Sequence, residues 1–193
     1  MTPPRETAVP QPLERPRGPL AAPFDPAWPV GRVAFTALAA VVILLDQLTK
    51  WLAVAFLRGR PPLELIPGYL RLWYAENTGA AFSVLEGHTE ILAGFSLIVS
   101  VVIFVWGWRL SPREQGLRVA LGLILGGALG NLIDRVYLRY VIDFISAHWH
   151  YKYVWPTFNI ADSAVCVGMF LLIVASFRIP SAPAKSADSP GST

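Results

Sequence analysis

Residues 159-NIADSAVCVGMFLLIVASF-177 combine an almost wholly apolar run with an amide and a carboxylic acid near its start. A helix needs about 20 mostly apolar residues to cross about 30 Å of hydrocarbon. Four windows of the chain meet this requirement, namely residues 33–57, 91–108, 117–137 and 158–177. The sequence therefore predicts an all-α integral membrane protein with four transmembrane helices.

The overall composition supports a membrane protein. Hydrophobic residues make up 54% of the 193 residues and charged residues 15%, which is more apolar than is usual for a soluble domain. The formal charge is +3, but the basic residues are scattered between apolar windows, so we expect no nucleic-acid partner. The single cysteine, Cys166, excludes an intramolecular disulfide and is expected to pack as a small apolar residue within a helix.

Two tails are expected to flank the membrane domain, which we place at residues 31–178. Residues 1–30 hold nine of the 17 prolines, a composition that cannot bury enough apolar surface to become ordered. We expect a disordered, proline-rich cytoplasmic tail at residues 1–30 and a flexible tail at residues 179–193. Arginines at the ends of several windows favour an orientation with both termini in the cytoplasm, although basic residues also lie at the opposite ends.

Two segments between the windows are expected to lie at the outer membrane surface. Within residues 58–90, apolar and polar side chains alternate from Leu70 to Tyr74, which predicts a short strand or hairpin. Residues 138–157 contain tryptophans and tyrosines typical of the lipid headgroup boundary. We expect this second segment to form an interfacial loop.

Polar side chains gather towards the outer ends of the windows. Asp46 lies about 20 Å along the first predicted helix, at a rise of about 1.5 Å per residue. In each of the last two helices an asparagine and an aspartate are three residues apart, which places them on one helix face. The acids and amides expected at this level are Asp46, Asn131, Asp134, Asp143, Asn159 and Asp162. Such groups normally face a bundle interior or an aqueous cavity.

Some of these acids also have a purely structural interpretation. Asp46 can pair with Lys50 one helical turn later. Asp134 can be held by Arg135 or Arg139 at the interface. For both aspartates, the sequence leaves the structural and the functional interpretation open.

Similar alternatives apply to the last two helices. Asp162 can favour the positive end of its own helix dipole, although Asn159 and Asp143 beside it favour a functional role. Gly122, Gly126 and Gly130 recur at four-residue spacing, which is typical of a close-packed helix face rather than a ligand site. We therefore predict a packing role for these glycines.

A pair of the clustered aspartates suits peptide hydrolysis. Two carboxyl groups close together in a poorly hydrated site cannot both ionise easily, so one keeps its proton. The ionised group can take a proton from water while the protonated group polarises the scissile carbonyl. A proton or ion pathway is the main alternative, and a structural membrane subunit is a third. His148 and His150 lie near the acids, but loop histidines are more often surface groups than ligands, and we expect no metal.

Five stretches resemble, in order, the sequence blocks of the bacterial lipoprotein signal peptidase family, also called signal peptidase II. They are DQLTK at 46–50, ENTGAAFSVL at 76–85, GGALGNLIDR at 126–135, VIDFI at 141–145 and FNIADSA at 158–164. The resemblance implies an aspartic endopeptidase of the bacterial cytoplasmic (inner) membrane. Its substrates would be prolipoproteins, cut just before a cysteine that carries a diacylglyceryl group. It implies no metal or cofactor, and it implies inhibition by cyclic peptides such as globomycin. We also expect contact with membrane lipid and a monomeric protein.

The resemblance also implies roles for individual residues. The catalytic pair would be Asp143 and Asp162, whereas spacing alone does not choose between Asp143 and Asp134. The other polar residues of the blocks would shape the site or hold the substrate backbone: Asp46, Asn77, Asn131, Asp134, Arg135 and Asn159. We also expect the loop after the first helix, with Gly79 and Gly87 near its end, to close over the substrate as a lid. The long proline-rich tail departs from the short amino-terminal segment usual in the family.

Overall fold

The computed structural model describes residues 27–79, 87–111 and 114–177. Four α-helices occur in this part of the chain: α1 Ala27–Leu57, α2 Thr89–Arg109, α3 Gln115–Tyr137 and α4 Ile160–Ser176. The expected C-terminal tail and residues 80–86 of the expected lid loop lie outside the described residues. Of the expected N-terminal tail, the last four residues already belong to α1 and the rest lies outside the described residues.

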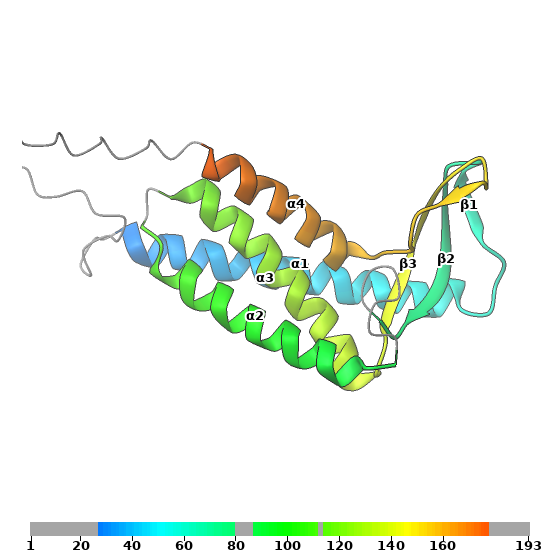
Figure 1. Ribbon diagram of the computed structural model, residues 1–193, viewed down its shortest axis with the longest axis horizontal. Helices are drawn as coiled ribbons and strands as arrows, with labels where there is room; N and C mark the ends of the chain where they lie inside the picture. Colours follow the sequence, from blue (N-terminus) through cyan, green and yellow to red (C-terminus); the bar gives the residue numbers. More distant parts are fainter. Residues whose placement is uncertain (1–26, 80–86, 112–113, 178–193) are drawn as a thin grey trace, which may run out of the picture.

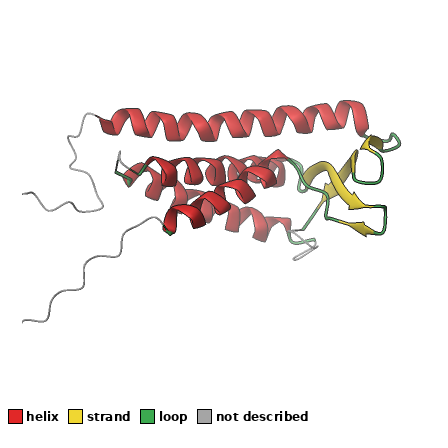
Figure 2. Cartoon of the chain, turned by 90° about the horizontal axis from the view of Figure 1, so that it is seen from above, coloured by secondary structure: helices red, strands yellow, loops and turns green. Residues whose placement is uncertain are grey.

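The helices run side by side as a bundle, with the strands gathered at one end (Figures 1 and 2). Helix α3 contacts each of the other three helices and is the central element of the bundle. The start of α1 and the end of α4 lie at the end of the bundle away from the strands (Figure 1).

Glycines allow α3 to approach its neighbours closely. A Cβ built on Gly122, Gly126 or Gly130 would meet residues of α1, and for Gly126 the distance to the Ala39 carbonyl oxygen would be 2.8 Å. A Cβ on Gly127 would collide with the Ala161 carbonyl oxygen of α4. The prediction that the spaced glycines form a packing face is therefore confirmed.

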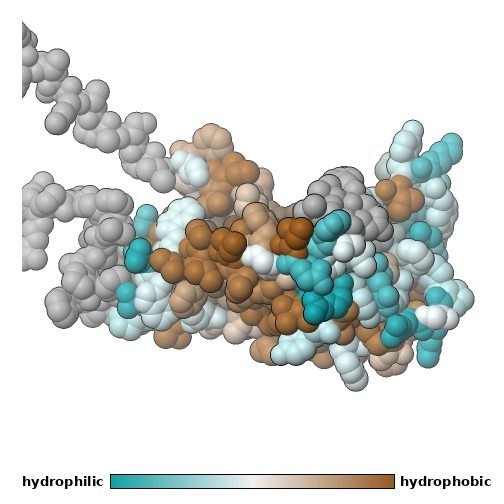
Figure 3. Space-filling model, turned by 60° about the horizontal axis from the view of Figure 1, so that its bottom comes forward, coloured by the Kyte–Doolittle hydropathy of each residue, from teal (hydrophilic) through white to brown (hydrophobic). Residues whose placement is uncertain are grey.

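Apolar side chains cover the outside of the bundle. Helices α1, α2 and α3 are long and apolar enough to cross a membrane, and α4 is apolar but has 17 residues. Large hydrophobic side chains remain exposed on the helices, for example Leu44 at 68% and Phe95 at 66%. Figure 3 shows these apolar surfaces over the helices and more polar surfaces towards the strand end. This distribution suits a bundle surrounded by lipid, because lipid removes the need for a polar exterior.

A small antiparallel sheet closes one end of the bundle. Its order is β1-β2-β3-β4, formed by Leu63–Ile66, Leu70–Asn77, Val141–Trp149 and Tyr153–Val154. The turn between β1 and β2 contains Gly68 at φ 82°, a conformation that glycine adopts without steric cost. The predicted hairpin in residues 58–90 is confirmed.

The expectation of an interfacial loop at residues 138–157 is wrong in part. Residues 141–149 form β3, which pairs with β2 and brings Asp143 opposite Ala75. Val141, Ile142, Asp143 and Phe144 are all buried, so the first half of β3 lacks the apolar-polar alternation that reveals a half-buried strand. The strand connects α3 to α4 and directs Asp143 towards both helices.

Candidate active site

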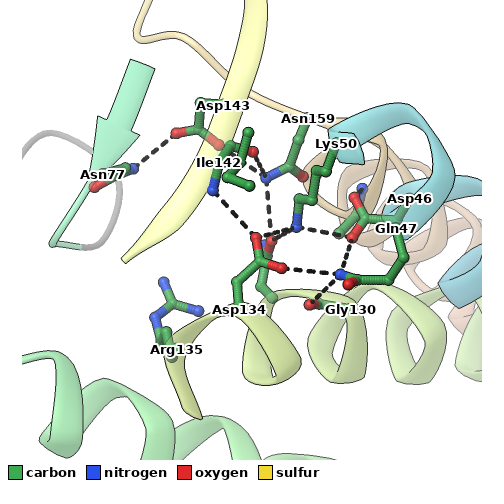
Figure 4. Close-up of polar contacts among 12 residues, drawn as sticks. Asp46, Gln47, Lys50, Asn77, Gly130, Asp134, Arg135, Ile142, Asp143 and Asn159 are labelled. Carbon is green, nitrogen blue, oxygen red and sulfur yellow. Dashed lines mark hydrogen bonds and ion pairs between the residues drawn. The ribbon is translucent and has the colours of Figure 1, made fainter. Parts of the chain in front are cut away.

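A buried lysine holds two of the predicted acids together. Lys50 Nζ lies 2.8 Å from Asp46 Oδ2 and 2.8 Å from Asp134 Oδ2, and the Lys50 side chain is 2% exposed. Gln47 Nε2 also donates to Asp134 Oδ1 at 2.9 Å and to the Gly130 carbonyl oxygen at 3.2 Å (Figure 4). A buried charge is costly unless it is paired, and here two carboxylates share one cation.

Both of these acids also accept a backbone N–H group. Asp46 Oδ1 accepts the N–H of Ala161 at the start of α4. Asp134 Oδ2 accepts the N–H of Ile142 at the start of β3. Asp46 and Asp134 thereby fix α4 and β3 to α1 and α3.

Two asparagines connect this cluster to the other two acids. Asn131 Oδ1 accepts from Lys50 Nζ at 2.9 Å, and its amide nitrogen donates to Asp162 Oδ1 at 2.7 Å. Asn159 Nδ2 donates to Asn131 Oδ1 at 3.1 Å and to Asp143 Oδ1 at 2.8 Å. The two asparagines therefore form a chain of hydrogen bonds that connects Lys50 to Asp143 and Asp162 and holds both acids in place.

Asp162 occupies the first turn of α4 in a capping box. Asn159 is the N-cap, its Oδ1 accepts the Asp162 N–H at 2.9 Å, and Asp162 Oδ2 accepts the Asn159 N–H at 3.2 Å. This reciprocal arrangement satisfies two N–H groups that a helix start leaves without partners. Asp162 therefore does act as a helix-end residue. The capping box uses only part of the hydrogen-bonding capacity of its carboxyl group, so the carboxyl can also make other contacts.

Asp143 is held from two sides and remains hard to ionise. Asn77 Nδ2 at the end of β2 donates to Asp143 Oδ2 at 2.9 Å, opposite the bond from Asn159. Burial, followed by the nearby charge of Asp162, raises the pKa of Asp143 from 3.8 to about 7. The hydrogen bonds from Asn77 and Asn159 and the charge of Lys50 oppose this rise. The Asp143 carboxyl therefore keeps its proton well above the usual range of an aspartate.

Asp143 and Asp162 line one cavity of about 810 Å³ between β2, β3 and the helices. Asn77, Asn131 and Arg135 also line it, whereas Asp46 and Asp134 do not. Apolar groups form much of the rest of the wall, including Val141, Trp155, Phe158, Val165 and Val167. The cavity thus presents two carboxyl groups against a largely apolar wall.

The structure revises several expectations about single residues. Asp46 pairs with Lys50 as predicted, but Asp134 pairs with Lys50 rather than with the two arginines. Arg135 Nη2 donates to the Gly79 carbonyl oxygen at 3.4 Å, and Arg139 Nη1 lies 3.0 Å from Glu90.

Cys166 departs from its expected place, because it is exposed and lines the cavity. His148 is buried, with Nε2 3.9 Å from Glu64 Oε2. In the part of the chain that the structure describes, no three His, Cys, Asp or Glu residues form a group suited to a metal ion.

Sequence reasoning missed the roles of Gln47 and Lys50 in linking α1 to α3. Both belong to the DQLTK stretch. Gln47 directly follows Asp46, and Lys50 lies four residues after it. Their contacts with Asp134 join positions more than 80 residues apart. Only the packing of α1 against α3 reveals that connection.

Comparison with known proteins identifies the family. The family model described as "Signal peptidase (SPase) II" matches residues 38–178. This chain belongs to the signal peptidase II family. The lipoprotein signal peptidase of Syntrophotalea carbinolica is 46% identical over 145 residues, which cover 73% of this chain and 89% of that relative. The lipoprotein signal peptidase of Coxiella burnetii is 46% identical over 162 residues, covering 80% and 93% respectively.

A solved structure supports the same assignment. It is described as a bacterial membrane enzyme determined by the in meso method at 2.3 Å resolution, and it shares 31% sequence identity with this chain. The similarity has a TM-score of 0.68 and covers 79% of this chain and 93% of that structure. The resemblance inferred from the five sequence blocks is confirmed, and the signal peptidase II assignment places the chain in lipoprotein processing. The proton-pathway alternative finds no support in these similarities.

Proposed function

We propose that this member of the signal peptidase II family is an aspartic endopeptidase that uses Asp143 and Asp162 to remove signal peptides from prolipoproteins. The observation that carries the proposal is the division of the four clustered acids, of which three are buried and Asp162 is half-buried. Asp46 and Asp134 are compensated by Lys50, whereas Asp143 and Asp162 line the cavity. The cavity pair is therefore the one available to a substrate.

The pair has the properties that peptide hydrolysis requires. Because burial and the charge of Asp162 raise the pKa of Asp143 to about 7, the pair retains a proton up to about neutral pH. The ionised carboxylate takes a proton from a water molecule as that water attacks the scissile carbonyl carbon. The protonated carboxyl donates to the carbonyl oxygen, and the proton taken from water then goes to the departing amine.

The supporting residues keep this pair in place. Asn77, Asn131 and Asn159 each donate a hydrogen bond to one of the two carboxyls. Arg135 lines the same cavity, where its guanidinium can donate to carbonyl oxygens of an extended substrate. Such fixed donors reduce the reorganisation that the reaction requires.

We propose that the substrate carries a diacylglyceryl-modified cysteine and is cut just before that residue. The cavity lies where the apolar bundle meets the sheet, and its wall is largely apolar. A lipid-modified cysteine positions the scissile bond at this boundary, because its acyl chains remain in the hydrocarbon. Val165 and Val167 of α4 provide apolar surface beside Asp162 for the signal peptide.

The proposed placement has four membrane spans in a bacterial cytoplasmic membrane. Helix α4 rises about 26 Å over its 17 residues, so the extended residues before it complete the crossing. Both termini lie in the cytoplasm, and the catalytic pair lies near the outer leaflet. A C-terminal fusion to an enzyme that is active only outside the cytoplasm should remain inactive, and activity of the fusion would reverse the orientation.

Two further properties belong to the same proposal, and the family resemblance implies the first of them. Cyclic peptides such as globomycin are expected to inhibit the enzyme by occupying the cavity. The enzyme is expected to act as a monomer, because both proposed catalytic groups come from one chain. Globomycin should therefore compete with substrate in steady-state kinetics; inhibition independent of substrate concentration would place its site elsewhere.

The substrate proposal is tested with purified full-length protein in detergent. A prolipoprotein carrying the diacylglyceryl group is compared with the same prolipoprotein lacking it, and mass spectrometry locates the cut. Cleavage just before the modified cysteine, with little cleavage of the unmodified protein, is expected. Equal cleavage of both forms would show that the lipid does not position the substrate.

A further inference from the structure

A second cavity lies at the end of the bundle away from the catalytic pair. It has a volume of about 400 Å³ and lies between the first turns of α1 and α3. Its apolar wall consists of Val30, Ala34, Phe35, Leu38 and Val119, and its polar lining consists of Gln115 and Arg118. Val30 is 71% exposed and Val119 is 44% exposed, so the apolar side of this cavity is continuous with the outer surface of the bundle.

Arg118 is a buried cation whose hydrogen bonds are incomplete. The residue is 5% exposed, and its Nη2 donates to the carbonyl oxygens of Leu110 and Ser111. Its Nε is buried and has no hydrogen-bond partner among the residues that the structure describes. Because a buried N–H group without an acceptor is costly, this guanidinium has capacity for one more acceptor.

Gly31 makes room for the guanidinium against α1. A Cβ built on Gly31 would collide with Nη1 of Arg118, so a larger residue there would displace the side chain. The absence of a side chain on Gly31 therefore lets the cation lie against the first turns of α1, at the edge of the cavity.

The local charge favours an anion. Among the residues that the structure describes, the charged groups that act on the Arg118 guanidinium are the cation of Arg32 and the carboxylate of Glu114. Glu114 is the N-cap of α3 but makes no side-chain cap, and the first turns of α1 and α3 contain no acidic residue. Two cations and two positive helix ends thus outweigh one carboxylate.

We propose that this cavity binds an anionic phospholipid of the inner leaflet, with its phosphate at Arg118 and an acyl chain against Ala34 and Leu38. The site goes beyond the proposed peptidase activity but relies on the proposed membrane placement. Arg118 lies 16 residues before Asp134 on α3, which corresponds to about 24 Å along the helix. This separation places Arg118 near the opposite headgroup level of a bilayer whose hydrocarbon core is about 30 Å thick.

A phospholipid explains features that a free anion does not. Five of the lining residues are apolar, four on α1 and Val119 on α3, and Val30, Ala34 and Val119 are exposed on the outer surface of the bundle. A free phosphate would leave this apolar wall uncovered. A zwitterionic headgroup such as phosphatidylcholine would bring its ammonium group towards Arg32 and Arg118, so an anionic lipid should bind more tightly.

Native mass spectrometry of the full-length protein tests this site. Dioleoyl phosphatidylglycerol and dioleoyl phosphatidylcholine are titrated separately, and phosphatidylglycerol is expected to bind at one site at least tenfold more tightly. Ala34→Trp, which fills the cavity, and Arg118→Gln should each abolish that preference. Val33→Trp and Arg60→Gln are the matched controls, because neither residue lines the cavity. Both variants should keep the preference for phosphatidylglycerol.

Several results would overturn the proposal. Equal binding of the two lipids by the wild type would show that the site does not select an anion, and unchanged preference in Ala34→Trp would place the lipid elsewhere. Displacement of the lipid by millimolar inorganic phosphate would show that a free anion occupies the site. If Arg118→Gln does not fold, the lipid preference of Ala34→Trp alone tests the proposal. Ala34→Trp should still cleave prolipoprotein, so a failure of this proposal is distinguishable from a failure of the peptidase proposal.

Discussion

The side chain of Asn159 lies 2.8 Å from Asp143 and at the same time caps the helix turn that carries Asp162. One amide thus fixes the position of both cavity carboxyls. Its nitrogen donates a hydrogen bond to Asp143, and its oxygen accepts one from the Asp162 N–H. The distance between the two acids therefore depends on a residue that need not take part in proton transfer itself.

Asn159→Ala should lower both stability and cleavage. The substitution removes the N-cap and leaves Asp143, Asn131 and the Asp162 N–H each short of one hydrogen bond, for a loss of about 2–4 kcal/mol in unfolding free energy. Thermal unfolding in detergent and cleavage rates check this. Ser163→Ala, which removes one bond to the Asn159 carbonyl oxygen, is the control and should cost about 1 kcal/mol or less. A wild-type melting temperature and rate for Asn159→Ala would refute the positioning role.

Lys50→Met should be among the most destabilising single changes. It leaves the Asp46 and Asp134 carboxylates buried without their cation, which typically costs about 3–5 kcal/mol. Adding Asp46→Asn and Asp134→Asn to this variant should recover part of the loss, because the uncompensated charges disappear. Denaturant unfolding measures both steps, with Lys152→Met at an exposed position as the control. A Lys50→Met variant as stable as the control would show that the three charges are not coupled.

Gly126→Ala should destabilise the bundle by about 1–3 kcal/mol, because the added Cβ would lie 2.6 Å from the Val42 Cβ and force α1 and α3 apart. Gly94→Ala in α2 has nothing within 4 Å of the added Cβ and should be neutral or stabilising by up to about 1 kcal/mol. Thermal unfolding of the two variants provides a matched comparison. Equal effects at both positions would mean that backbone propensity, rather than close packing, decides the outcome.

The cleavage rate should fall as the pH rises through about 7. Above the raised pKa of Asp143 the pair loses its shared proton and can no longer protonate the scissile carbonyl. Rates at substrate concentrations well below KM, measured in detergent between pH 5 and pH 9, report the apparent pKa of the free enzyme. A rate that stays constant to pH 9 would contradict a singly protonated pair.

The same raised pKa affects stability. Because the folded state keeps the Asp143 proton while the unfolded chain releases it near pH 3.8, the folded state binds more protons between about pH 4 and pH 7. The contribution of Asp143 to unfolding free energy therefore decreases as the pH rises across this window. Asp143→Asn, which cannot ionise, should flatten that decrease, and an unchanged pH slope would show that Asp143 titrates normally.

The sequence predicted much of the fold because the membrane imposes a strong constraint. Apolar windows give each helix to within a few residues, except that α1 begins at Ala27 rather than near residue 33. The sequence pattern did not predict β3, because Val141 to Phe144 are buried on both faces and show no alternation of apolar and polar residues. The pairing of β3 with β2 joins residues 64 to 77 positions apart, which periodicity does not report.

The residues of the candidate site were predictable from the sequence. Which of the acids pair with Lys50 and which line the cavity was not. Helical spacing brings Asn131 beside Asp134 and Asn159 beside Asp162, and the sequence blocks include every residue of the cluster. Spacing alone did not separate Asp143 from Asp134. That separation depends on Lys50, which reaches Asp134 across the contact between α1 and α3.

The most direct test of the central claim is cleavage of a diacylglyceryl-modified prolipoprotein by the wild type and by Asp143→Asn, Asp162→Asn and Asp134→Asn, each confirmed to be folded. The account predicts that the first two variants lose at least about 10³-fold in rate, as expected for groups that take part in the chemical step, while Asp134→Asn retains measurable cleavage. Full activity in Asp143→Asn together with loss in Asp134→Asn would contradict the proposed pair.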